Sequence, residues 1–124
     1  MEEINREKEL KMKVLSLKQP YAELILQGKK KIELRLYDEK RQALRLGDTI
    51  VFSELPHGRE QIQVKVIALL LYPTFNALLR DLPLSLLGYS TDVDWRELAK
   101  SMYTHYTKEE ELKDGVVGIR IELV

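Results

Sequence analysis

Hydrophobic and polar residues alternate along five stretches of the chain, and a period of two is typical of β-strands with one buried face. The predicted strands are residues 13–18, 31–37, 49–54, 61–72 and 116–123. The first half of the stretch 61–72 alternates strictly, whereas its second half is apolar on both faces, which predicts deeper burial there. The turn-forming residues Pro-His-Gly-Arg at 56–59 predict a hairpin before this long strand.

Apolar residues at helical spacing separate these strands. Pro20 suits the first position of a helix, and Gly28 is a typical residue at which such a helix ends. Pro73-Thr74 is predicted to start one further short helix, and capping residues predict two more: one from Asp94 to about Tyr103, and one after the capping box that begins at Thr107. The stretch 38–45 is predicted as a polar connection and 82–88 as a compact apolar connection. Together these elements favour an α+β fold with a small mixed or antiparallel barrel.

One predicted strand carries a row of charges on its polar face. Lys31, Glu33 and Arg35 share that face, and apolar residues occupy the other. Alternate positions lie roughly 6.5–7 Å apart along a strand, so the three charged side chains can converge on one small polar ligand. The alternative is an ordinary solvated face, on which Glu33 and Arg35 form an exposed ion pair worth about 0–1 kcal/mol.

Charge is unevenly distributed along the chain, although the total is zero. Residues 13–45 hold nine basic against four acidic residues, a balance of +5, and residues 81–124 hold five against nine, a balance of −4. A neutral total argues against a protein that coats duplex DNA, because such binding requires many phosphate contacts. The basic first third is compatible with a local phosphate or RNA site.

Composition limits the class of protein. The 124 residues, of which 44% are hydrophobic and 32% charged, indicate one soluble domain at 13–124 with an N-terminal lead-in at 1–12. The absence of cysteine excludes disulfides and fits a reducing cytoplasm. The longest apolar run, 66–72, is far shorter than the ~20 residues of a membrane helix. We therefore expect a cytoplasmic protein that has no membrane partner.

Several catalytic and metal-binding motifs are missing. The chain has no Gly-rich phosphate loop, no helical pair of histidines and no nucleophile-elbow serine. The three glutamates at 109–111 are interpreted as the acidic opening turn of a helix. We expect neither a metal ion nor another cofactor. Among the aromatic residues, Tyr103 and Tyr106 are candidates for the wall of a cleft.

The chain resembles the ASCH domain, the activating signal cointegrator homology domain of the PUA-like superfamily. The signature of that family, Gly-x-Lys-x-x-Glu-x-Arg, is matched by Gly28, Lys30, Glu33 and Arg35. Flanking matches follow in the expected order: Leu17-x-x-Pro20-x-Ala22, Leu46-Gly47-Asp48, and the closing segment from Gly115 to Arg120. The resemblance covers nearly the whole chain after residue 12.

The resemblance implies a small PUA-like β-barrel of about five strands, with short helices bordering a cleft and the signature residues at that cleft. It selects Lys30 in place of Lys31, which then becomes an ordinary flanking charge. The residues expected to bind ligand are Gln19, Pro20, Gly28, Lys30, Glu33, Arg35 and Tyr103.

The first function that the resemblance implies is binding of RNA, a nucleotide or a modified nucleoside, because related PUA-like domains bind RNA. Lys30 and Arg35 can hold phosphate or a carbonyl oxygen, and Glu33 can accept hydrogen bonds from the amino group of a base. On this hypothesis, Lys30→Ala and Arg35→Ala abolish binding with little loss of thermal stability.

Two alternatives stay open. A hydrolase, either an amidohydrolase on acylated nucleosides or an RNA phosphodiesterase, would use Lys30 and Glu33 as catalytic residues. Its second carboxylate would come from one of Asp92, Asp94 or Glu97. Small bacterial ASCH proteins that look like such amidohydrolases carry a threonine where this chain has Glu33, so their nucleophile does not transfer. The other alternative is a protein-interaction adaptor, since the family is named after a coactivator component.

Overall fold

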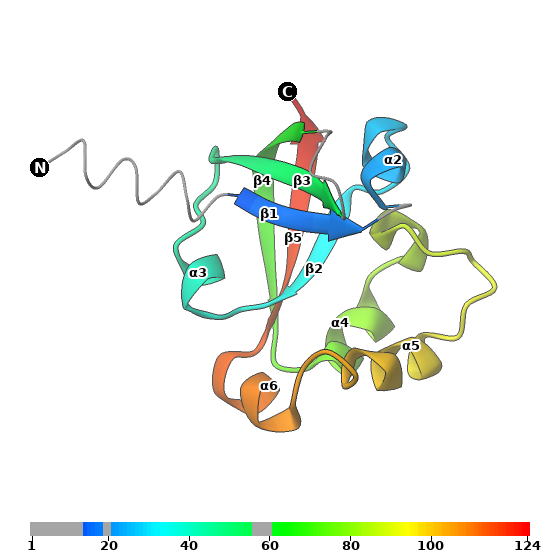
Figure 1. Cartoon of the computed structure of the whole chain (residues 1–124). Coiled ribbons are helices and arrows are strands. Elements are labelled where there is room, and N and C mark those ends of the chain that lie inside the picture. Colours follow the sequence, from blue (N-terminus) through cyan, green and yellow to red (C-terminus); the bar gives the residue numbers. More distant parts are fainter. Residues whose placement is uncertain (1–13, 19–20, 56–60) are drawn as a thin grey trace, which may run out of the picture.

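A strongly curved sheet of five strands organises the computed structural model of the chain (Figure 1). The structure describes residues 14–18, 21–55 and 61–124. The strands are β1 (Val14–Lys18), β2 (Ile32–Leu36), β3 (Thr49–Leu55), β4 (Gln61–Tyr72) and β5 (Val116–Leu123). Their order in the sheet is β1-β3-β4-β5-β2, in which β1 and β3 are parallel and the other neighbours antiparallel. The predicted α+β class and barrel-like sheet are confirmed.

Short helices connect the strands. They are α2 (Tyr21–Leu26), α3 (Glu39–Gln42), α4 (Phe75–Asp81), the 3₁₀ helix η1 (Leu84–Leu87), α5 (Trp95–Met102) and α6 (Lys108–Asp114). The predicted capping box is confirmed, because Thr107 Oγ1 accepts from the Glu110 N–H while the Glu110 carboxylate accepts from the Thr107 N–H. Every helix in the described ranges is too short or too polar to cross a bilayer.

Two predicted connections contain helices instead. Asp38 accepts a hydrogen bond from the Arg41 N–H and so begins α3 inside the polar stretch 38–45. The apolar stretch 82–88 forms η1, which ends at Gly88 in the left-handed region, with φ of 91°. The predicted hairpin at 56–59, the lead-in at 1–12 and the domain boundary at 13 lie outside the described residues.

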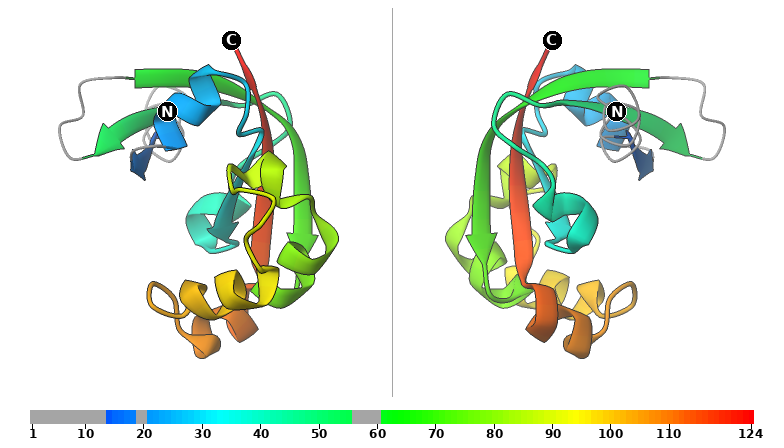
Figure 2. Two further views of the ribbon diagram at one scale, coloured as in Figure 1. Left: turned by 90° about the vertical axis from the view of Figure 1, so that its right-hand side faces the viewer. Right: turned by 90° about the vertical axis from the view of Figure 1, so that its left-hand side faces the viewer.

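Two clusters of apolar side chains form the core. Figure 2 shows β4 and β5 running side by side from the end of the molecule that holds β1 and β3 to the end that holds α5 and α6. The barrel cluster lies among the strands and α2: Leu15, Ala22, Ile25, Leu44, Ile50, Phe52, Ile62, Val64, Val66, Val117, Ile119 and Ile121. The helix cluster joins β2 and β5 to α4, η1 and α5: Ile32, Leu36, Phe75, Leu78, Leu79, Leu87, Ala99 and Val116.

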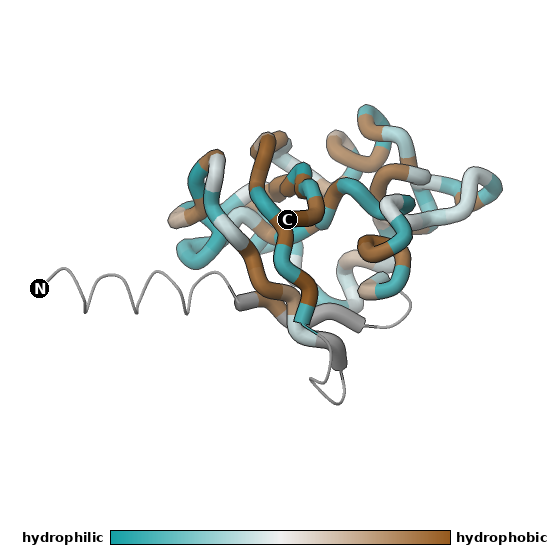
Figure 3. Tube along the Cα trace, turned by 90° about the horizontal axis from the view of Figure 1, so that it is seen from above, coloured by the Kyte–Doolittle hydropathy of each residue, from teal (hydrophilic) through white to brown (hydrophobic). Residues whose placement is uncertain are grey.

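The second half of β4 is not more deeply buried than the first, so that prediction is wrong. Ile67 and Leu71 are 41% and 56% exposed. Figure 3 shows how hydrophobic and hydrophilic residues follow one another along the trace of the chain. A bulge between Val66 and Ala68 shifts the pairing of β4 with β5. Beyond the bulge, Leu69 packs against the barrel cluster, whereas Leu70 and Tyr72 pack against the helix cluster. The apolar run therefore reflects partial burial on both faces.

A buried carboxylate joins three of the helices. Glu111 of α6 is 6% exposed and accepts a hydrogen bond of 2.8 Å from the backbone N–H of Phe75, at the start of α4. The hydroxyl of Tyr103, just after α5, donates to both carboxylate oxygens at 2.9 Å. Burial of the phenol and its hydrogen bond to Glu111 raise the pKa of Tyr103 to about 12. Glu111 therefore lies in the first turn of α6, as predicted, and its hydrogen bonds also link α4 and α5 to that helix.

We expect Glu111→Ala to lower the free energy of unfolding by about 2–3 kcal/mol, because the Phe75 N–H and the Tyr103 hydroxyl both lose a charged acceptor. Glu109→Ala, an exposed neighbour on α6, is the matched control and is expected to change stability by no more than about 0.5 kcal/mol. Urea unfolding of the three proteins measures the difference. Equal losses for both variants would contradict a structural role for Glu111.

Candidate ligand-binding site

The junction between α2 and β2 places Lys30 beside the charged residues of β2. After α2 the backbone N–H groups of Lys29 and Lys30 both donate to the Leu24 carbonyl, and Gly28 takes a left-handed φ of 74° that only glycine adopts easily. The chain therefore reverses tightly before β2. Lys31 N–H then bonds to the Leu86 carbonyl of η1, which docks the start of β2 against that turn.

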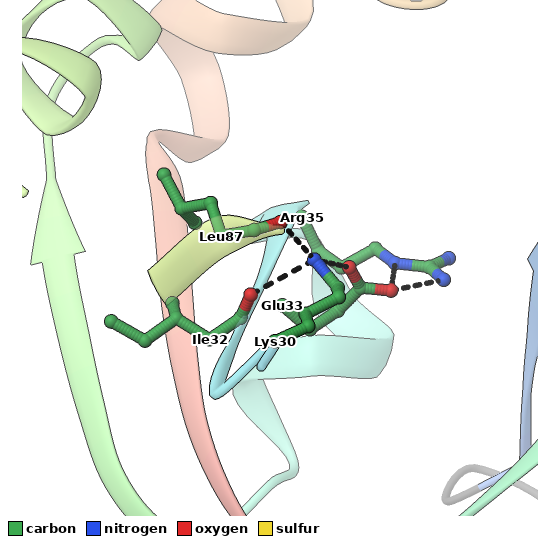
Figure 4. Close-up of polar contacts among 5 residues, drawn as sticks. All are labelled: Lys30, Ile32, Glu33, Arg35 and Leu87. Carbon is green, nitrogen blue, oxygen red and sulfur yellow. Dashed lines mark hydrogen bonds and ion pairs between the residues drawn. The ribbon is translucent and has the colours of Figure 1, made fainter. Parts of the chain in front are cut away.

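The ammonium group of Lys30 is fully engaged. Its Nζ lies 3.0 Å from the Ile32 carbonyl oxygen, 2.8 Å from the Leu87 carbonyl oxygen and 3.2 Å from Glu33 Oε1 (Figure 4). An ammonium has three N–H donors, so these three acceptors use its whole capacity. Lys30 is also only 5% exposed. In this arrangement it positions Glu33 and leaves no donor for a ligand.

Glu33 is held between two cations. Its Oε1 faces the Lys30 ammonium, while Oε2 accepts from Arg35 Nε at 3.2 Å and from Arg35 Nη2 at 2.8 Å (Figure 4). Burial acts to raise the pKa of Glu33, but the charges of Lys30 and Arg35, with hydrogen bonds from both, leave that pKa below its usual value. Glu33 is therefore ionised at neutral pH and can only accept hydrogen bonds.

The pKa of Lys30 is set by a different balance of effects. Burial lowers its pKa, and the Coulombic attraction of Glu33 and the hydrogen bond to it only partly offset that effect. The positive charge of Arg35 adds to the lowering. The cost of burying the Lys30 charge is therefore only partly offset, and the single carboxylate of Glu33 pairs with both cations.

These charged side chains are more deeply buried than either interpretation of the sequence predicted. The strand pattern indicated charges displayed on an exposed face, yet Glu33 is 6% exposed and the Arg35 side chain 18%. The pair of Glu33 and Arg35 is thus not the weak surface ion pair of the alternative. Removing Lys30 would take the donor away from Glu33 Oε1 and from two buried carbonyl groups, so little loss of stability is no longer expected for Lys30→Ala.

Gly88 is a site residue that the sequence did not nominate. A Cβ atom added there would lie 3.3 Å from Lys30 Cδ and 3.4 Å from a methyl group of Leu24. Its backbone also has a positive φ. The glycine lets η1 end close against Lys30, with the Leu87 carbonyl aimed at the ammonium. The signal in the sequence that could have indicated this residue was the single glycine that follows the apolar run 82–87.

Two tyrosines border the charged group and were also missed. The rings of Tyr21 and Tyr89 meet edge to face, with centroids 6.0 Å apart, and Lys30 Nζ lies 5.2 Å from the centre of the Tyr21 ring. Burial raises the pKa of Tyr89, and the charge of Tyr21, a hydrogen bond to Tyr21 and the charge of Glu33 add to this. In the sequence, Tyr21 is one of the apolar residues at helical spacing between Pro20 and Gly28, and Tyr89 has no periodic signal.

The remaining predicted residues are dispersed. Gln19 and Pro20 lie outside the described residues. Tyr103 contacts Glu111 and packs edge to face on Phe75 at 6.0 Å, so its contacts are those of the helix cluster. The three candidate second carboxylates take other roles: Asp92 accepts from the Ser90 hydroxyl, Asp94 caps α5, and Glu97 pairs with Lys100 on the surface.

A hollow of about 700 Å³ lies elsewhere, between the end of β4 and α6, and its walls include Leu71, Tyr72, Leu112 and Val116. None of the predicted site residues lines it, so a cleft at Glu33 stays a prediction. Within the described ranges, no group of three or more His, Asp or Glu side chains is suited to a metal ion.

Comparisons with known proteins agree with the fold and with the signature. The model of the ASCH domain family matches residues 15–124. The crystal structure of the hypothetical protein PH0355 is 38% identical in sequence with a TM-score of 0.76, over 90% of this chain and 97% of that one. The solution NMR structure of protein PF0455 from Pyrococcus furiosus is 35% identical with a TM-score of 0.70, over 90% and 96% of the two chains.

No functionally curated protein matches the chain. The family match nevertheless covers all of the sheet except Val14, including the turn that carries Lys30 and the strand that carries Glu33 and Arg35. The resemblance inferred from the signature is confirmed, and the chain belongs to the ASCH domain family.

Proposed function

We propose that this protein is a binding module for single-stranded RNA or a modified nucleoside, with Lys30, Glu33 and Arg35 at the ligand site. The observation that carries the proposal is the buried, ionised carboxylate of Glu33 between two cations. Burying three charges in a small domain costs stability. A buried group of charges is therefore more typical of a functional site than of a region that only stabilises the fold. Absence of cysteine and the charge distribution suit a cytoplasmic RNA ligand better than duplex DNA.

The three residues have distinct roles in this proposal. Lys30 is a positioning residue, because its donors are used within the protein. Glu33 accepts an N–H group of the ligand, since an ionised carboxylate offers about four acceptor sites and Lys30 and Arg35 occupy three. Arg35 is the most exposed of the three and supplies the positive charge that faces phosphate.

The aromatic neighbours support a ligand with a ring. Tyr21 and Tyr89 are both partly buried beside Lys30 and Glu33. Aromatic side chains stack on unpaired bases without regard to sequence, a contact worth about 1–3 kcal/mol per base. Charged and aromatic groups placed together are typical of sites that hold single-stranded nucleic acid.

The same ion pairs argue against general-base catalysis by Glu33. A general base works best when its pKa is near the operating pH, whereas Lys30 and Arg35 hold the pKa of Glu33 below its usual value. In addition, the candidate second carboxylates have other partners or positions, as described above. We therefore place binding ahead of hydrolysis, and the adaptor after both.

Arg35→Lys is expected to weaken binding of a mixed-sequence single-stranded RNA by about tenfold or more, because the amine keeps the charge but loses the planar fork that contacts Glu33. Fluorescence anisotropy at fixed salt measures the dissociation constant. Lys31→Ala, which removes an exposed flanking cation, is the matched control and should weaken binding much less. Equal losses in both variants would mean that any nearby cation serves, and that Arg35 has no special place.

Stability should depend on pH through Glu33. Because the folded pKa is lowered, the ionised carboxylate stabilises the protein fully above the unfolded pKa of about 4.3 and loses this contribution as pH falls through the folded pKa. The difference in unfolding free energy between the wild type and Glu33→Gln should therefore shrink below about pH 4. Glu39→Gln, at an exposed carboxylate on α3, is the control. A difference for Glu33→Gln that stays constant from neutral pH to strong acid would be incompatible with this linkage.

Acylated cytidine incubated with the wild type should be bound without release of the acyl group, because Glu33 is too weak a base for efficient proton abstraction. Chromatography of the nucleoside after long incubation gives the result, with Glu33→Gln as the matched variant. Turnover by the wild type that Glu33→Gln abolishes would establish the hydrolase in place of the binding module.

A further inference from the structure

The edge of β2 that faces away from β5 carries backbone groups that do not bond to β5. In an antiparallel pair, residues alternate between those that bond to the partner strand and those that point away from it. The Tyr37 N–H donates to the Gly115 carbonyl, and the Ile121 N–H donates to the Lys31 carbonyl. Glu33 and Arg35 lie at alternate positions between Lys31 and Tyr37, so the register directs their backbone groups to β5 as well. The N–H and C=O groups of Ile32, Leu34 and Leu36 therefore point to the open edge.

Lys30 shows that this edge belongs to the charged site. The Ile32 carbonyl on the open edge accepts from the Lys30 ammonium, the same group that contacts Glu33 (Figure 4). Leu34 is the next residue of that series, and it lies between Glu33 and Arg35 in the chain. Among the described residues, none bonds to the N–H or C=O of Leu34 on this edge.

Resting on the proposed function, we propose that the N–H and C=O of Leu34 read the hydrogen-bonding edge of a nucleobase beside Glu33. An extended residue directs its own N–H and C=O to the same side, as a neighbouring donor and acceptor. The Watson–Crick edge of an unpaired base presents an acceptor and a donor at comparable spacing. Glu33 adds a further acceptor for an amino or ring N–H of the same base. The ligand is thus recognised by its base and not by phosphate alone.

The shape of the edge favours a base over a peptide strand. Strand addition uses a row of alternate backbone groups. On β2 the Lys30 ammonium already occupies the Ile32 carbonyl, and the chain turns into α3 soon after Leu36. The uninterrupted edge is therefore short. A planar ring with one donor and one acceptor needs only the groups of Leu34.

The first experiment compares two RNA probes of equal length, a single-stranded oligonucleotide and the same backbone without bases. Wild-type protein should bind the base-containing RNA at least about tenfold more tightly, because the abasic backbone cannot pair with Leu34 or Glu33. If the two probes bind equally well, base recognition is overturned while RNA binding stands. If the wild type binds neither probe and does not bind a free modified nucleoside, the proposed function itself fails, and this inference fails with it.

The second experiment locates recognition at Leu34. Leu34→Pro removes the outward N–H without removing a bond to β5, and proline is tolerated on edge strands for this reason. It should lower the preference for base-containing RNA about tenfold and leave abasic RNA binding unchanged. Leu34→Ala, which keeps the N–H and loses the side-chain contact with the helix cluster, is the matched control and should keep the preference.

An ester bond in place of the Leu34 amide keeps the leucine side chain and removes the N–H, and on the open edge it changes no other group, because the weakened Glu33 carbonyl faces β5. It serves as the second variant if the proline protein does not fold. Retention of the full preference in the ester protein would overturn the proposal. If either variant loses binding to an extended peptide strand while its RNA binding is unchanged, the edge serves strand addition. That result also overturns the proposal.

Discussion

The buried carboxylate of Glu33 is the interaction on which the rest of the site depends. One anion pairs with two cations, and these ion pairs offset part of the cost of burying Lys30 and partly burying Arg35. The same anion fixes where the cations point, because Lys30 reaches Oε1 and Arg35 reaches Oε2. A short stretch of chain thus carries a compact group of charges with a net charge of +1.

Backbone groups complete this arrangement. The Lys30 ammonium is satisfied by the carbonyls of Ile32 and Leu87 as well as by Glu33. The turn at Gly28 aims the side chain, and Gly88 leaves room for it. Glycine is needed at both places for physical reasons, a left-handed φ in the first and a close approach combined with a positive φ in the second.

Most of the fold follows from local patterns in the sequence. All five predicted strands form, and the capping residues Thr74, Asp94 and Thr107 begin the helices expected of them. Burial could not be predicted in the same way, because it depends on contacts between distant segments. Strand alternation placed Glu33 on a polar face but held no information on η1, which covers Lys30. The contact between the rings of Tyr21 and Tyr89 could not be predicted for the same reason.

The contact between Lys30 and Leu87 has a consequence for how the protein folds. It joins residues that are 57 positions apart. To form it, the chain must lose the entropy of closing the intervening loop. The strand that carries Glu33 pairs with β5, which is also distant in the sequence. The charged group is therefore complete only where these distant segments are folded together, and a peptide of residues 28–36 alone would lack the Leu87 acceptor.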